Sequence, residues 1–143
     1  MSIVHFATHG QFSSDADETF LLTWDDKITA NEFSTLLDSP GRDREPIELL
    51  VLSACQTAAG DDRAALGLAG IAVRAGARST IASLWKVNDA ATAELMVGLY
   101  ERLSVGQVDK AQALQQAQLD VLHTAPTSHP YYWAAFVLVG NWQ

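Results

Sequence analysis

The sequence predicts an α/β fold in which a mostly parallel sheet is covered by helices on both faces. The apolar run from Ile47 to Leu52 is typical of a strand that is buried on both faces. Such runs alternate along the chain with segments of helical periodicity, which favours right-handed crossovers between parallel strands. A chain of 143 residues can bury a core of its own, so we expect residues 1–143 to form a single domain.

The first half of the chain alternates predicted strands with loops. Ser2 to Thr8 is β-branched and aromatic and stops at His9-Gly10, as expected of a strand that meets a turn. Thr29 and Glu32 form a capping box, which predicts a helix that continues through Leu37. The other predicted segments are a polar loop over 11–18, a short strand over 19–24, a charged loop over 38–46 and the strand 47–52.

The second half of the chain is mostly helical by prediction. Arg63 to Ala75 is rich in alanine and glycine, which predicts a helix packed closely on the sheet with Gly76 as its C-terminal cap. Further helices are predicted to begin at Asn88 or Asp89 and at Asp109, because these residues are favourable N-caps. Strands are predicted over 78–84 and 132–139, and loops over 56–62, 104–108 and 124–130.

Composition excludes several classes of function. Acidic residues number 17 against 9 basic ones, and at a net charge of −8 the chain lacks the basic patches that bind nucleic acid. No apolar run approaches the roughly 20 residues of a membrane-spanning helix. The single cysteine, Cys55, allows no internal disulfide, which favours a reducing, cytoplasmic setting.

Two residues with complementary chemistry follow predicted strands: His9 follows the first, and Cys55 follows the strand 47–52. In open α/β sheets the active site usually lies at the carboxyl ends of the strands. A thiol is nucleophilic only as the thiolate, and a nearby imidazole both lowers its pKa and later protonates the leaving group. The backbone amides of Gly10 and Cys55 are candidates for an oxyanion hole.

The same residues also fit other interpretations. A lone cysteine at a strand end is more often a small buried apolar residue than a nucleophile. His9 lies 46 residues before Cys55, and this pairing favours catalysis. Metal binding is not expected, because one cysteine and scattered histidines lack ligand spacing. A small-molecule-binding domain is disfavoured, because no glycine-rich phosphate loop follows a predicted strand.

Motifs spread over nearly the whole chain resemble the CHAT domains, a caspase-like family of peptidase clan CD. The matching stretches, in the family's order, are Ala7 to Gly10, Leu52 to Thr57, Gly67 to Ala69, Ala75 to Ser79, Ala82 to Thr92 and Pro130 to Phe136. Caspases carry a Gln-Ala-Cys motif with the histidine about 50 residues upstream. The resemblance implies a caspase-like three-layer sandwich that cleaves peptide bonds in protein or peptide substrates, with His9 as base and Cys55 as nucleophile. It also implies no metal or organic cofactor, and a tetratricopeptide-repeat region is a possible neighbour in the parent protein.

Trp85 and Asp89 follow the predicted strand 78–84, where a fold of this kind would build its substrate pocket. The hypothesis is that Trp85 forms a wall and that Asp89 receives a basic or polar side chain at the substrate's P1 position. The alternative is structural, because Asp89 is also a good N-cap and Trp85 fits ordinary packing at the edge of the core. An Asp89→Ala variant distinguishes the two roles, since it loses either substrate preference or stability.

The chain begins directly at the histidine strand, whereas CHAT domains have further strands and helices before it. We therefore expect the sheet to lack the family's first strands, which leaves Ile3 to Thr8 as an apolar edge that proteins normally cover. A second copy pairing with this edge would give a homodimer. The missing strands also motivate a second hypothesis for the function, a catalytically inactive caspase-like interaction or assembly module.

Overall fold

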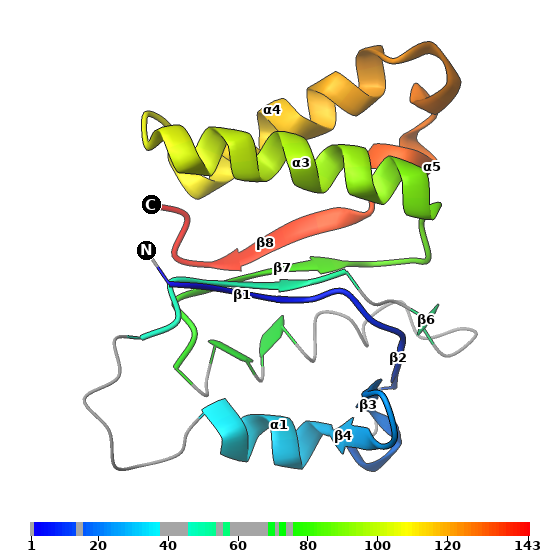
Figure 1. Cartoon of the computed structure of the whole chain (residues 1–143), viewed down its shortest axis with the longest axis vertical. Coiled ribbons are helices and arrows are strands. Elements are labelled where there is room, and N and C mark those ends of the chain that lie inside the picture. The colour runs from blue at the N-terminus through cyan, green and yellow to red at the C-terminus, as the bar shows by residue number, and fades with distance from the viewer. Residues whose placement is uncertain are drawn as a thin grey trace.

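The computed structural model describes residues 2–13, 16–37, 46–53, 56–57, 69–70, 72–73 and 76–143. Its larger sheet has the strand order β1-β5-β7-β8 (Figure 1). These strands are β1 (Ile3–Phe6), β5 (Leu49–Leu52), β7 (Ser79–Ser83) and β8 (Phe136–Gly140). The first three run parallel and β8 runs antiparallel to β7. The mostly parallel sheet predicted from the sequence is therefore confirmed.

Helices lie on both faces of this sheet. The helices whose bounds lie within the described residues are α1 (Ala30–Leu37), α3 (Asp89–Val105), α4 (Lys110–His123) and α5 (Pro130–Trp133), with short 3-10 helices η1 (Ala16–Glu18) and η2 (Ala125–Thr127). In Figure 1, α3 and α4 lie on one side of the sheet and α1 lies on the other. The fold is therefore an α/β sandwich of three layers, as expected. None of the described helices is long and apolar enough to cross a membrane.

Strand β5 connects the two cores because its side chains alternate between the faces of the sheet. Leu49 and Val51 pack in the cluster formed with α3 and α4. Leu50 and Leu52 pack in the cluster on the opposite face, which also contains Phe33 of α1. Each of these five side chains is at most 1% exposed. This double burial explains why the strand is apolar on both faces.

A smaller sheet with the order β4-β3-β2-β6 lies beyond the carboxyl ends of β1 and β5 (Figure 1). Its strands are β4 (Lys27–Thr29), β3 (Phe20–Leu22), β2 (Gly10–Phe12) and β6 (Gln56–Thr57). β2 is antiparallel to β3 and parallel to β6. The loop predicted over 11–18 is therefore wrong in part, since β2 and η1 occupy most of it. Strands of two or three residues are too short to show a period in the sequence.

The helix starts agree with the capping signals. Glu32 accepts hydrogen bonds from the Thr29 amide at 2.9 Å, and the Glu32 amide donates to the Thr29 hydroxyl at 3.3 Å, so the predicted capping box is confirmed. At the start of α3 the side chain of Asn88 accepts from the amides of Ala90 and Ala91. Asn88 is therefore the N-cap, and Asp89 is the first helical residue.

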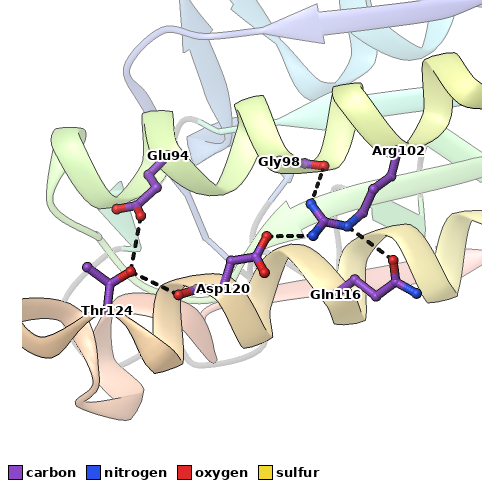
Figure 2. A network of polar contacts seen from close by, with 6 residues as sticks. All are labelled: Glu94, Gly98, Arg102, Gln116, Asp120 and Thr124. Carbon is purple, nitrogen blue, oxygen red and sulfur yellow. Dashed lines mark hydrogen bonds and ion pairs between the residues drawn. The ribbon is translucent and has the colours of Figure 1, made fainter.

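A network of polar contacts joins α3 to α4 (Figure 2). The guanidinium of Arg102 donates to the Gly98 carbonyl at 2.8 Å, to Gln116 at 3.1 Å and to Asp120 at 2.6 Å. Beside it, the hydroxyl of Thr124 donates to the Asp120 carbonyl at 3.0 Å. Since α3 carries one wall of the candidate site, this network also fixes that wall relative to the rest of the helical layer.

Two predicted elements differ from the structure. The closing strand predicted over 132–139 begins only at Phe136, because Pro130 starts the short helix α5. Proline suits the first turn of a helix, and His129 caps it by accepting a hydrogen bond from the Tyr131 amide at 3.1 Å. The helix predicted over 63–75 lies mostly outside the described residues, although 69–70 and 72–73 are helical. Gly76 has a φ of 104°, as suits its predicted capping position.

Candidate functional site

A pocket of about 370 Å³ opens at the carboxyl ends of the parallel strands. Its lining includes His9 beyond β1, Ser53 at the end of β5, Ser83 at the end of β7 and Asp89 at the start of α3. Parallel strands bring their carboxyl ends to one edge of the sheet, which is where open α/β folds bind ligands. Three parts of the sequence, around residues 9, 53 and 83–89, therefore contribute polar side chains to one concave surface.

His9 lies in the link between β1 and β2, with its side chain exposed in this pocket. Its carbonyl accepts a hydrogen bond from the Leu22 amide at 2.7 Å, which ties the link to β3. The next residue, Gly10, is buried and begins β2. The imidazole is thus presented to the pocket by backbone that both sheets hold in place.

Cys55 lies outside the described residues, but the chain is described up to Ser53 and again from Gln56. Before it, Leu52 pairs with Phe6, and the Ser53 amide donates to the Phe6 carbonyl at 3.2 Å. After it, Gln56 pairs with Gln11 in a parallel ladder. His9 and Cys55 therefore each follow a strand of the first ladder in the sequence and precede a strand of the second.

A chain of hydrogen bonds crosses one side of the pocket. The Nε2 atom of His5 lies 2.8 Å from the Ser53 hydroxyl, and its Nδ1 atom lies 2.8 Å from the Tyr100 hydroxyl. Desolvation lowers the pKa of His5 and raises that of Tyr100, so both are neutral near pH 7. These three residues were not among the predicted site residues; the available signal was a histidine within an otherwise apolar strand.

Asp89 and Trp85 occupy different positions relative to the pocket. Asp89 lines it together with Lys86, so a carboxylate and an ammonium group meet the same space. Trp85 is not among the lining residues. Its indole packs against the core on the α3 side and donates to the Tyr131 carbonyl at 3.0 Å. The Tyr131 hydroxyl in turn donates to the Lys86 carbonyl at 2.5 Å. Trp85 and Tyr131 therefore contact the backbone that carries Lys86, without lining the pocket themselves.

The described residues contain no group of three or more His, Cys, Asp or Glu side chains that could hold a metal ion. The polar groups available at the pocket are instead imidazoles, hydroxyls, one carboxylate and one ammonium group. These groups suit proton transfer and hydrogen bonding to a bound molecule.

Comparison with protein families agrees with this architecture. A family model for the CHAT domain matches residues 1–141. The chain belongs to the CHAT domain family. The match covers nearly the whole chain, and it confirms the resemblance predicted from the motifs. Because CHAT domains are caspase-like, membership also agrees with the mostly parallel, three-layer α/β arrangement. No curated protein matched the chain.

Proposed function

We propose that this CHAT domain is a cysteine endopeptidase that hydrolyses peptide bonds in protein substrates, with His9 as the base and Cys55 as the nucleophile. The observation that carries the proposal is the pair of ladders on either side of these residues. Phe6 pairs with Leu52 before them and Gln11 pairs with Gln56 after them. In the sequence, both residues are thus flanked by strands of the same two pairings, which supports the proposal.

The pocket chemistry supports the same reaction. His9 would take the proton of the Cys55 thiol, and the thiolate would attack the carbonyl carbon of a peptide bond. The amine would leave with the proton returned by His9, and water, deprotonated by the same imidazole, would then hydrolyse the thioester to a carboxylic acid. A reducing compartment keeps a lone thiol free of disulfide exchange, which is why we propose a cytoplasmic location.

An oxyanion hole formed by the amides of Gly10 and Cys55 fits the strand pattern. In an antiparallel ladder successive residues direct their backbone groups to opposite sides of the strand. Because His9 accepts from Leu22 of β3, the backbone groups of Gly10 face the other side, where β6 lies. β6 begins directly after Cys55 in the sequence. A single donor of this type contributes about 3 to 4 kcal/mol to the transition state.

Asp89 is the proposed recognition group for a basic P1 side chain. Since Asn88 caps α3, the carboxylate of Asp89 is not required for capping and remains exposed in the pocket. Lys86 opposes this preference electrostatically, so replacing it should strengthen the selection of basic residues. Trp85 is proposed to form the outer wall behind Lys86, and Trp85→Phe tests whether its hydrogen bond to Tyr131 is needed.

An irreversible probe tests the proposed reaction. We expect an acyloxymethyl ketone with a P1 lysine to label Cys55, with its thiolate displacing the carboxylate group, and expect His9→Ala to abolish labelling. His123→Ala is the matched control, because His123 is an exposed histidine at the end of α4. Labelling that is equal in His9→Ala and in the control would overturn the assignment of His9.

The same experiment separates the enzyme from the inactive interaction module. A panel of probes that differ only at P1 is expected to react fastest when P1 is basic, and Asp89→Asn is expected to remove this preference. Glu94→Gln is a matched control, since it removes an exposed carboxylate elsewhere on α3. Failure of every probe to label the folded protein would favour the module.

A further inference from the structure

Three side chains from three elements meet at one side of the candidate pocket. His5 comes from β1, Ser53 from the end of β5 and Tyr100 from α3. Both ring nitrogens of His5 are within hydrogen-bond distance of a hydroxyl, at 2.8 Å in each case. The rings of His5 and Tyr100 also contact each other, with centroids 5.8 Å apart. The histidine is therefore fixed from two sides.

The backbone places His5 on the face of the sheet that α3 covers. Its neighbours Val4 and Phe6 pack in the core on the opposite face, as strand alternation requires. Tyr100 is partly buried and packs against the core on the α3 side. The side chain of His5 is exposed, and each of its ring nitrogens nevertheless has a hydroxyl partner.

The hydrogen-bond chain works with either neutral tautomer of His5. A hydroxyl group can donate or accept, so Ser53 and Tyr100 can each adapt to the ring nitrogen that they face. Neither tautomer leaves a ring nitrogen without a partner. Because the pKa of His5 is lowered and that of Tyr100 is raised, both of these side chains are uncharged near neutral pH.

Ser53 is the member of this hydrogen-bonded group that lies nearest to Cys55 in the sequence. Its amide donates to Phe6, and its hydroxyl contacts His5, so β1 holds both its backbone and its side chain. Cys55 follows only two residues later in the sequence. The direction in which the chain leaves β5 is thus set by contacts with β1, the strand that leads to His9.

We infer that His5 and Tyr100 are positioning residues that hold Ser53 so that Cys55 is presented to His9. The inference rests on the proposed function, because it concerns the same thiol. His5 itself need not contact the substrate or the thiol. Effective catalysis depends on sub-ångström placement, and a displacement of about 1 Å can reduce rates about a hundredfold.

The single cysteine makes the test direct, because alkylation by iodoacetamide reports on Cys55 alone. His5→Phe keeps an aromatic ring and removes both nitrogens, Tyr100→Phe removes one hydroxyl, and His5→Gln keeps part of the hydrogen bonding. We expect His5→Phe to lower the alkylation rate and the maximal labelling rate of the P1-lysine probe by about tenfold or more. The probe concentration for half-maximal labelling should change less than the maximal rate, because the Asp89 contact is kept; Tyr100→Phe leaves His5, which also lines the pocket, in place and separates the two effects.

The variants should also behave as one unit. Tyr100→Phe and Ser53→Ala are expected to lower the labelling rate less than His5→Phe does. The double variant His5→Phe/Tyr100→Phe should lower it no further than His5→Phe alone, and His5→Gln should restore part of the rate. Thermal unfolding of each variant, with His123→Phe as the control, separates positioning from folding. A lowered melting temperature with unchanged labelling would overturn the inference and leave His5 with a purely structural role.

The outcome for His9 keeps the two proposals distinguishable. If His9→Ala slows labelling and His5→Phe does not, the proposed function stands and the positioning role fails. If neither change slows labelling, the assignment of the dyad fails as well. Attachment of the probe to Ser53 instead of Cys55 would overturn both, because Ser53 would then be the nucleophile.

Discussion

Gln11 of β2 lies opposite Gln56 of β6 in a parallel ladder. His9 precedes Gln11 by two residues and Cys55 precedes Gln56 by one. The two strands that follow these residues in the sequence, β2 and β6, are therefore paired in the smaller sheet, as the two strands before them, β1 and β5, are paired in the larger sheet.

Asn88 and Asp89 are adjacent but should differ in what they contribute. Asn88→Ala removes the side chain that caps α3, and we expect it to lower the free energy of unfolding by about 1 kcal/mol. Asp89→Asn should cost clearly less stability while changing the P1 preference. Urea denaturation of both variants, beside the probe panel, checks this. Equal losses of stability would show that the Asp89 carboxylate has a structural role.

The pH dependence of stability should report on His5. Partial desolvation lowers the pKa of His5 below the ordinary value of 6.5, so the unfolded chain takes up a proton at higher pH than the folded chain. The stability linked to His5 is present above about pH 6.5 and is lost as the pH falls through the lower, folded pKa. Wild type should therefore lose more stability than His5→Phe between about pH 7 and about pH 5. Denaturation at fixed protein concentration measures this, and parallel pH curves would contradict it.

Gly140, at the end of β8, should not tolerate a side chain. Its φ is 103°, and a Cβ atom there would lie 2.5 Å from the Arg78 carbonyl oxygen. We expect Gly140→Ala to destabilise the fold by about 2 kcal/mol or more, since backbone strain and a steric clash combine. Gly106→Ala is the matched control, because Gly106 has a φ of 68° but open space around it. If Gly106→Ala were destabilised as much as Gly140→Ala, the loss of stability would come from the positive φ alone and not from the steric clash.

Arg102 should stabilise the contact between α3 and α4. Its guanidinium is largely buried and bonds both helices, whereas the carboxylate of Asp120 is half exposed. We expect Arg102→Ala to cost about 1 to 2 kcal/mol, and Asp120→Asn to cost less. Chemical denaturation of the two variants tests this order. An Asp120→Asn loss equal to that of Arg102→Ala would mean that the ion pair dominates.

The edge strand β1 should pair with a second copy of the chain. In the described part of the larger sheet, β1 has one neighbour, β5, so its other edge is open to another strand. We expect a homodimer by light scattering at tens of micromolar. Ile3→Lys, which places a charge on this strand, should shift the protein toward monomer. A wild-type monomer at that concentration would contradict the pairing.

Elements with strong local signals were predictable and elements held by neighbours were not. The capping box at Thr29 and Glu32 and the apolar strand β5 carry their own signals, because helix caps and doubly buried strands restrict residue type. Strand β2 contains glycine and glutamine, which have no strong preference for strands, and its pairing with β3 and β6 stabilises it. The apolar run after Pro130 fits either a strand or a helix by its sequence pattern. The hydrogen bond that the cap residue His129 accepts stabilises a helix over the first part of this run, α5.

The candidate site likewise has features that were predictable from the sequence and features that depend on tertiary contacts. The sequence by itself determined the family and the residue types, because His9, Gly10 and Cys55 stand in motifs whose chemistry is readable from their order. Only the tertiary structure decided that Asn88 takes the capping role and that His5 lies between Ser53 and Tyr100. Those outcomes depend on which side chains meet across strands and helices 48 and 95 residues apart, and no local pattern encodes such a distance.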